Sequence, residues 1–438
     1  MRKMKFAGLL SLCMVPAMFW SSESQAVPSW ARKYGVSCYM CHTQMPGRNA
    51  VGEAFKNNGY RFPGAQENAL AKQKNIQIGN DAWAKDFPNA PVTGSYPQFS
   101  PLSVVIQSNF LSYTGATKTV STGVETKKST TVINGFDNGV LFFYAGTFGD
   151  NLSVLGDVGT FGAPTSTSTG AGTFAAPGNN IRVVWQFSPG FNLAIGNNYS
   201  NQNWNGTGAG NVTNLSAVLP APLDYAELNF TRGETAGYSI VAGTSTAART
   251  QSAIFSNVLG SNSNSFDDLI YLRGKLKVYG AGLLSGANGE LGNSYNGLDN
   301  QVTIGAGFTK GRNTPGFGFA GNYTGETFVY GADIQGVHND ILVGAAVSKD
   351  KDLGFTNYKA EVGSFIYPWL FAKIGYTNIA VANATNSVDQ HKPTIVPTVV
   401  ANVGPNVTFQ GTYTYNTADT NAGLNNPNTF VLALRAGF

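Results

Sequence analysis

Residues 180–187, NIRVVWQF, alternate two kinds of side chain with the two-residue period of a β-strand. One face of this strand is wholly apolar and the other carries polar groups: Ile181, Val183, Trp185 and Phe187 against Asn180, Arg182, Val184 and Gln186. We therefore expect one face to meet an apolar environment and the other to meet water or packed polar groups.

The same pattern recurs along the chain from Leu102 onward, for example in 224–231 (DYAELNFT), 329–336 (VYGADIQG) and 358–367 (YKAEVGSFIY). Tight turns such as FGDN, SPGF, RGET and YPWL alternate with long loops near 161–178, 201–221, 246–265 and 285–299. Short turns at one end and long loops at the other are typical of outer-membrane barrels. The last segment, 430–438 (FVLALRAGF), ends on Phe438 and resembles the C-terminal assembly signal of bacterial outer-membrane proteins.

Composition agrees with a barrel. Charged residues make up only 12% of the chain, aromatic residues also make up 12%, and there are 53 glycines; a soluble protein usually has about 25% charged residues. There is no run of 18 apolar residues after the first 26 positions, and no fixed repeat period that would indicate a β-solenoid. We predict an all-β fold, a transmembrane outer-membrane β-barrel of about 16 to 18 antiparallel strands over 102–438.

The N-terminus reads as a signal peptide over 1–26, with basic residues Arg2, Lys3 and Lys5, the apolar run 6–20 and the cleavage site SQA. Cleavage would remove Cys13 and lower the net charge from +4 to +2, which gives no reason to expect nucleic acid as a partner. Residues 27–65 form a separate segment with one expected helix within 48–62, ended by Gly59. Residues 66–101 are a proline-interrupted connector.

The motif Cys38-Tyr39-Met40-Cys41-His42 is the attachment signature of haem c. Two thiols at this spacing reach the two vinyl groups of one porphyrin, and His42 becomes the proximal ligand of the iron. A redox pair, a zinc site and a disulfide are weaker interpretations, because there is no βαβ pattern, no fourth zinc ligand nearby, and a disulfide would leave His42 unexplained. We predict one haem c.

The distal ligand of the iron stays open. Apart from Met40, which lies inside the motif, the remaining methionine and histidines of the mature chain are Met45, His338 and His391. His338 is expected at a short turn on the periplasmic side, and His391 in a long outer loop. A lysine, an oxygen ligand or an open position remain as alternatives.

The segment 27–62 resembles the N-terminus of the fused outer-membrane monohaem cytochrome–porins of iron-oxidising bacteria. The resemblance lies in Pro28-Ser29-Trp30-Ala31-Arg32, the haem motif, Pro46, and Phe55-Lys56 followed by Gly59-Tyr60. Trp30 stands in place of the usual Phe, and Val51-Gly52-Glu53 in place of Phe-Gly-Arg, which exchanges a base for an acid.

The resemblance implies an outer-membrane electron-transfer protein that oxidises extracellular Fe(II) and passes the electron to a periplasmic c-type cytochrome or similar carrier. It implies that segment 27–65 enters from the periplasm and plugs the lumen, with Phe55 and Tyr60 packing on the porphyrin and Arg32 and Lys56 meeting its propionates. Chemistry beyond one-electron transfer is not implied. The alternatives are a haem-bearing porin channel and outward electron transfer to an acceptor other than iron, and the sequence has no cluster with the spacing of an iron site.

Overall fold

The structure is a computed structural model. It describes residues 28–36, 40–44, 47–48, 50–62, 75–77, 95–97, 101–121, 124–133, 140–159, 179–197, 200–201, 224–233, 236–245, 269–280, 300–312, 326–351, 354, 356–367, 369–381, 390–404, 407–417 and 428–437. The predicted signal peptide, most of the connector, Cys38, Met45 and Phe438 lie outside these residues.

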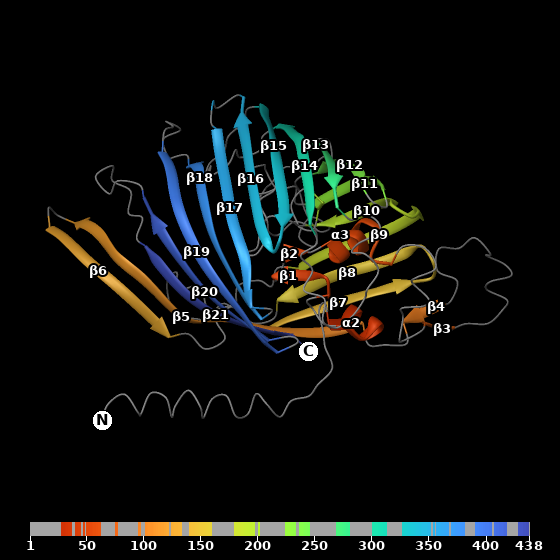
Figure 1. Cartoon of the computed structure of the whole chain (residues 1–438), viewed down its shortest axis with the longest axis horizontal. Helices are drawn as coiled ribbons and strands as arrows, with labels where there is room; N and C mark the ends of the chain where they lie inside the picture. Colours follow the sequence, from red (N-terminus) through yellow and green to blue (C-terminus); the bar gives the residue numbers. More distant parts are fainter. Residues whose placement is uncertain are drawn as a thin grey trace, which may run out of the picture.

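One antiparallel sheet closes on itself to form a barrel (Figure 1). Its strands are β5 (Leu102–Ser121), β6 (Val124–Ile133), β7 (Val140–Phe148), β8 (Leu152–Gly159), β9 (Asn179–Ser188), β10 (Phe191–Asn197), β11 (Asp224–Arg232), β12 (Gly237–Ser245), β13 (Leu269–Tyr279), β14 (Gln301–Arg312), β15 (Glu326–His338), β16 (Ile341–Asp350), β17 (Thr356–Tyr367), β18 (Leu370–Val381), β19 (Gln390–Gly404), β20 (Val407–Asn416) and β21 (Thr429–Gly437). Two small two-stranded sheets are not part of the barrel sheet: β1 (His42–Gln44) with β2 (Gly47–Arg48), and β3 (Asn75–Gln77) with β4 (Ser95–Pro97).

The first barrel strand has two partners on the same side. Residues 102–106 of β5 pair with β7, whereas residues 111–121 pair with β6. The closed circuit through β5 and β7 therefore holds sixteen strands, and β6 pairs with the outer half of β5 as a seventeenth. This confirms the predicted barrel and the predicted range of strand number.

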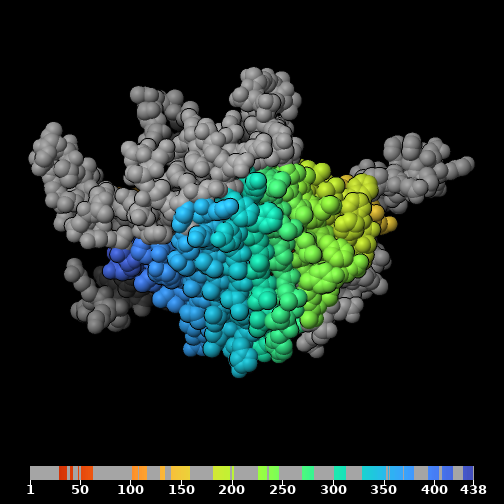
Figure 2. Space-filling model, turned by 90° about the horizontal axis from the view of Figure 1, so that it is seen from above, coloured from red at the N-terminus to blue at the C-terminus, as the bar shows by residue number. Residues whose placement is uncertain are grey.

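The inward and outward faces are those expected from the alternation. Arg182, Val184 and Gln186 of β9 are buried inside, whereas Phe187 is 51% exposed on the outer wall. On β15, Val329 and Asp333 are buried and Ile334 is 49% exposed. Figure 2 shows the outer wall as one continuous surface in which the strand colours follow each other without a break. The apolar face is thus the one that meets lipid.

Exposed aromatic rings gather near the two ends of the outer wall. Tyr238, Tyr279, Tyr367 and Trp369 lie near one end, and Tyr330, Tyr358, Tyr376, Tyr413 and Tyr415 lie toward the other. Tyr358 and Tyr367 of β17 are about 30 Å apart along the strand at ~3.3 Å per residue, or about 23 Å along the barrel axis at a tilt of ~40°. That height matches the apolar band of ~25 Å in outer-membrane barrels, with its two aromatic girdles.

Connections at the end of the barrel that carries Tyr367 and Trp369 are mostly tight. The β15–β16 turn consists of Asn339 and Asp340, both with positive φ, which is the two-residue hairpin that suits the twist of antiparallel strands. One expectation was wrong: residues 285–299 were grouped with the long loops of the opposite end, but they fall between β13 and β14 and so belong to the short-turn end. Successive strands run in opposite directions, so the end at which a connection lies depends on how many strands precede it, and uncertain strand boundaries obscure that number in the sequence.

Two helices precede the barrel, α2 (Pro28–Tyr34) and α3 (Ala50–Asn57). Both end in the same way, with a glycine of positive φ, Gly35 or Gly59, whose N–H bonds to a carbonyl three residues back while the next N–H bonds to one five residues back. The helix expected within 48–62 is confirmed, including its end at Gly59. Helix α2 was not expected. Within the described residues, no helix is long and apolar enough to cross a membrane.

We predict that Val362→Lys on the outer face of β17 lowers the free energy of unfolding in lipid vesicles by about 2–4 kcal/mol, because it places a charge near the bilayer midplane. Val362 pairs with Val343 and Ile374, both exposed on the same face. Tyr358→Lys, near the end of the same strand, is the control and is expected to cost about 0–1 kcal/mol. Equal urea midpoints for the two variants would contradict the assigned membrane position.

Candidate functional site

The N-terminal segment lies inside the barrel, against the inner faces of β7 to β11 (Figure 1). Its core consists of aromatic rings: Trp30 stacks on Tyr60 at 4.6 Å between centroids and meets Phe55 edge-on at 5.2 Å. Tyr34 and Phe62 join the same cluster, which packs on wall residues such as Ala145, Leu155 and Val184. Each such ring pair contributes about 0.5–1.5 kcal/mol beyond the area it buries. We call residues 28–62 the plug.

Polar contacts fix the plug at the end of the barrel that has the short turns. Arg61 donates a hydrogen bond of 2.7 Å to the carbonyl oxygen of Gly149 in the β7–β8 turn. The side-chain oxygen of Asn58 accepts one of 3.1 Å from the N–H of Gly190, in the β9–β10 turn. Lys33 donates one of 3.1 Å to Thr147 on β7. The plug is therefore held by backbone and side-chain groups of several strands.

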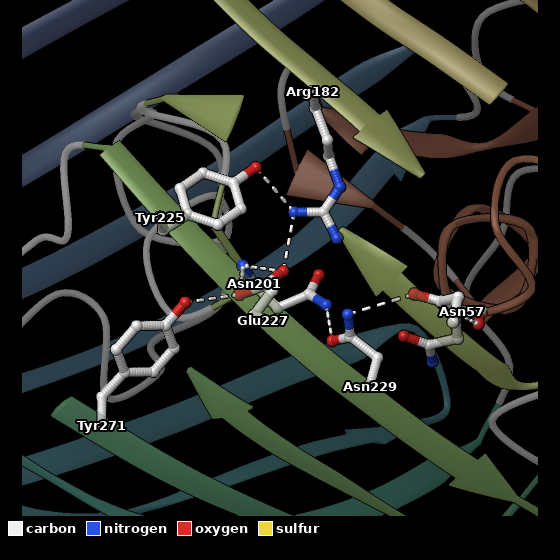
Figure 3. A network of polar contacts seen from close by, with 8 residues as sticks. Asn57, Arg182, Asn201, Tyr225, Glu227, Asn229 and Tyr271 are labelled. Carbon is white, nitrogen blue, oxygen red and sulfur yellow. Dashed lines mark hydrogen bonds and ion pairs between the residues drawn. The ribbon is translucent and has the colours of Figure 1, made fainter. Parts of the chain in front are cut away.

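A buried network lies on the wall beside the plug (Figure 3). Arg182 forms a 2.7 Å ion pair with Glu227, and Tyr225 and Tyr271 hold the pair through hydrogen bonds of 2.9 and 2.8 Å. The network continues from Glu227 through Asn201, Asn229 and Asn192 to the carbonyl oxygen of Asn57 in α3. A buried charge pair is tolerated only when its remaining groups are hydrogen-bonded, and here the wall supplies most of those bonds.

One acid joins plug and wall. Glu53 of α3 accepts hydrogen bonds from Arg48 at 2.9 Å and from Lys275 of β13 at 3.0 Å. Burial alone would raise the pKa of the Glu53 carboxyl, but Lys275, Arg48 and Lys56 together hold it well below its usual range. The base-to-acid exchange noted at position 53 is thus compensated by two cations, one of them from the barrel.

A cavity lies inside the plug, and its lining is mostly apolar. It is lined by Trp30, Ala31, Tyr34, Val36, Cys41, His42, Arg48, Gly52, Phe55, Lys56, Tyr60 and Phe62. Cys41 and His42 therefore open onto the same space, together with two cations and five aromatic residues of the plug core. An apolar pocket with a few convergent polar groups is the usual form of a cofactor site.

Close packing at one glycine shapes this cavity. A Cβ on Gly52 would lie 2.1 Å from the carbonyl oxygen of Cys41. Helix α3 can therefore lie directly against the backbone of the cysteine motif only because residue 52 has no side chain. This contact sets the position of Cys41 and His42 relative to Phe55 and Lys56, which lie on the next turn of α3.

The structure brings together five of the residues predicted from sequence: Cys41, His42, Phe55, Lys56 and Tyr60 line the cavity. Arg32 is not among the lining residues, and it donates a 2.6 Å hydrogen bond to the carbonyl oxygen of Leu102. Cys38 and Met45 lie outside the described residues.

Of the two distal histidine candidates, His338 does not line the cavity. His338 is exposed at the end of β15, beside the Asn339–Asp340 turn, at the short-turn end as expected. His391 is the second residue of β19, at the opposite end, and so does not lie in a loop; its side chain is outside the described part of the structure.

Several residues that line the cavity or support it were not predicted from the sequence. Trp30 and Tyr34 are four positions apart, which puts both on one face of α2, but a seven-residue helix gives too short a pattern to recognise. Arg48 pairs in register with His42 across the β1–β2 hairpin, which only the fold reveals. Lys275 is 222 residues from its partner Glu53, and no local signal connects them.

The residues present fit a covalently bound haem. Burial raises the pKa of the Cys41 thiol to about 12, partly offset by Arg48, so an uncharged sulfur is favoured there, as in a thioether. The same burial disfavours the thiolate that a reactive redox pair needs. Aromatic walls suit the porphyrin faces, and Arg48 and Lys56 suit its two propionates.

We predict that Gly52→Ala loosens the plug by about 1–3 kcal/mol, because the added methyl group overlaps backbone atoms that cannot give way. Helix propensity alone would favour alanine by about 1 kcal/mol, so a destabilised variant identifies the contact as the cause. The measurement is the rate of proteolysis of the N-terminal segment in the folded protein. Gly274→Ala, where a Cβ would meet nothing within 4 Å, should leave that rate unchanged.

Plug docking is also expected to depend on pH through Glu53. Because the pKa of Glu53 is depressed in the folded protein, its ion pairs stabilise docking fully above the ordinary carboxyl pKa of about 4.3 and are lost as the pH falls below it. Proteolysis of the plug by an acid-stable protease should accelerate below about pH 4, and Glu53→Gln should weaken docking at neutral pH and remove most of this acceleration. Lys373→Gln, which breaks a 3.0 Å pair with Glu361 within the wall, is the control.

No protein-family model and no curated protein matches the sequence. Among solved structures, the outer membrane channel DcaP of Acinetobacter baumannii aligns with 11% identity and a TM-score of 0.45, covering 77% of this chain and 96% of the channel. An anion-selective porin from Comamonas acidovorans aligns with 10% identity and a TM-score of 0.41, covering 77% and 97%. OprB of Pseudomonas putida aligns with 8% identity and a TM-score of 0.46, covering 77% and 93%. These likenesses are distant, and the barrel is established by the closed strand order of this chain.

Proposed function

We propose that the protein is an outer-membrane electron-transfer protein with one haem c attached to Cys38 and Cys41, with His42 as proximal ligand. It takes electrons from extracellular Fe(II) and passes them to a periplasmic c-type cytochrome or similar carrier. The observation that carries the proposal is the cavity of the plug, where Cys41 and His42 face aromatic rings and two cations inside a closed barrel. We likewise propose membership of the monohaem cytochrome–porin family on the strength of segment 27–62.

Each lining residue then has a physical task. Trp30, Phe55 and Tyr60 exclude water and offer flat apolar surfaces. Arg48 and Lys56 would hold the propionates. Lys275 forms an ion pair with Glu53, so the negative charge of Glu53 is balanced and does not repel the propionates. Bound haem supplies a one-electron couple, and the protein tunes it through burial and nearby charge. The barrel wall around the plug keeps this couple away from lipid.

The substrate side follows from the chemistry of iron. Fe(II) gives up one electron, and the ferric product is poorly soluble, so accepting the electron outside keeps the precipitate out of the periplasm. The bilayer core insulates over about 30 Å, and a redox centre held within the barrel shortens that distance. Within the described residues, no group of three or more His, Cys, Asp or Glu side chains lies together, so we infer a transient encounter with Fe(II) rather than a binding site.

A channel is the second candidate, supported by the wall itself. A circuit of sixteen strands can enclose an aqueous lumen, and inward positions opposite the plug carry charged side chains such as Lys359, Glu361 and Lys373. The aromatic core of the plug packs on the β7–β11 side of the wall. A lumen partly filled by the plug would pass small solutes along the other side.

The test is the visible spectrum of the purified mature protein, oxidised and mixed anaerobically with Fe(II). We expect the sharp bands of reduced haem c, and a haem-stained band on a denaturing gel that Cys38→Ser/Cys41→Ser removes. Cys13→Ser, in the predicted signal peptide, is the matched control and should leave both unchanged.

The outcomes separate the candidates. A haem that dithionite reduces but Fe(II) does not would exclude iron as the donor and favour outward electron transfer. Absence of covalent haem from the wild-type protein would overturn the proposal as a whole. Steady conductance in planar bilayers, unaltered by His42→Gln, would support the channel.

A further inference from the structure

Three lysines surround two aromatic rings on the outer wall, at the end of the barrel that carries most of the long loops. Lys310 of β14 stands opposite Phe328 of β15, and Tyr330 stands opposite Lys349 of β16. The N–H of Lys351 donates a 2.9 Å hydrogen bond to the carbonyl oxygen of Phe328, which places Lys351 on the other side of that ring from Lys310. We call these five residues the lysine patch.

The spacing of the patch follows from the sheet. Lys310 and Lys351 are separated by two strand spacings, or about 10 Å, and Lys349 is two residues from Lys351, or about 7 Å. All three side chains are exposed. Three cations that flank a pair of rings 5.8 Å apart can therefore reach one multiply charged anion from two sides.

Two nearby acids point away from the patch. Asp333 and Asp350 belong to the same strands, but both are buried on the inner face. The described residues at the opposite ends of β14, β15 and β16 contain no lysine or arginine. Among the described residues of this part of the wall, the outward lysines thus lie at one rim.

The surface below the patch is apolar. Moving from the patch toward the middle of the barrel, the outward positions of β15 and β16 include Ile334, Val343 and Val347, each at least 40% exposed. Tyr330 belongs to the aromatic girdle at this end. A ligand of the patch therefore meets cations at its polar end and a lipid-facing wall along the rest of its length.

We propose that the lysine patch binds the phosphate groups of a phosphorylated glycolipid in the outer leaflet, with the acyl chains lying along β15 and β16. The lysine stems lie along the aromatic rings while the ammonium groups reach the headgroup layer. A soluble phosphate would use the cations and ignore the apolar rows, and a protein partner in the membrane would have to bury three lysine charges. The inference does not depend on haem and also orients the long-loop end toward the cell exterior.

The test is native mass spectrometry of the full-length mature protein with purified diphosphoryl lipid A as the probe. Lys310→Gln/Lys349→Gln/Lys351→Gln should weaken binding on the order of 100-fold, since each lysine near a charged headgroup is worth about fivefold. Arg232→Gln, an exposed outward arginine at the opposite rim, is the matched control and should leave binding unchanged. Because all four residues are exposed, the heat-modifiable gel mobility of the folded barrel should be retained in every variant.

Two further probes distinguish the source of the phosphate. Lipid A stripped of both phosphates should bind the wild type and the triple variant equally weakly. Inorganic phosphate at millimolar concentration should fail to displace lipid A. Equal binding of lipid A to the wild type and the triple variant, undiminished binding of the stripped lipid, or displacement by free phosphate would each overturn the proposal.

Discussion

A strand edge left without a partner inside a bilayer costs several kcal/mol per backbone group, because no water is present to satisfy it. Pairing of β21 with β5 removes the last such edges, and the other features depend on this closure. Closure fixes which side chains point inward and which outward, and it encloses a space that a plug can fill. The outer wall is left apolar between two aromatic girdles, as lipid requires.

The inner face of the barrel has the opposite requirement to the outer wall: its side chains are largely polar, and buried polar groups need hydrogen-bond partners. Much of this need is met between plug and wall. Glu53 of the plug forms an ion pair with Lys275 of β13. The buried pair of Arg182 and Glu227 is connected to α3 by hydrogen bonds through asparagine side chains. The plug and the wall therefore stabilise each other around a cavity that the plug itself lines.

Local patterns in the sequence predicted the local features. Alternation with period two predicted the β-strands of the barrel and which face of each strand points outward, because each strand carries that signal within a few residues. The cysteine motif predicted the site residues Cys41 and His42 for the same reason. The contacts that complete the site were not predictable: Lys275 and Glu53 are far apart in sequence, α2 is too short to show a period, and the end to which residues 285–299 belong follows from strand order alone.

The seam between β5 and β21 also governs the order of events during biogenesis. It joins the first and last strands of the barrel, so the wall cannot shut until nearly the whole chain has been exported. The plug precedes β5, and most of its anchors lie on β7 to β10, with others on β5 and β13. A segment that reaches its seat while the sheet is still open needs no passage through a finished pore. The plug can then take its position before β5 and β21 pair, so a cofactor attached to the plug need not fit through the closed lumen.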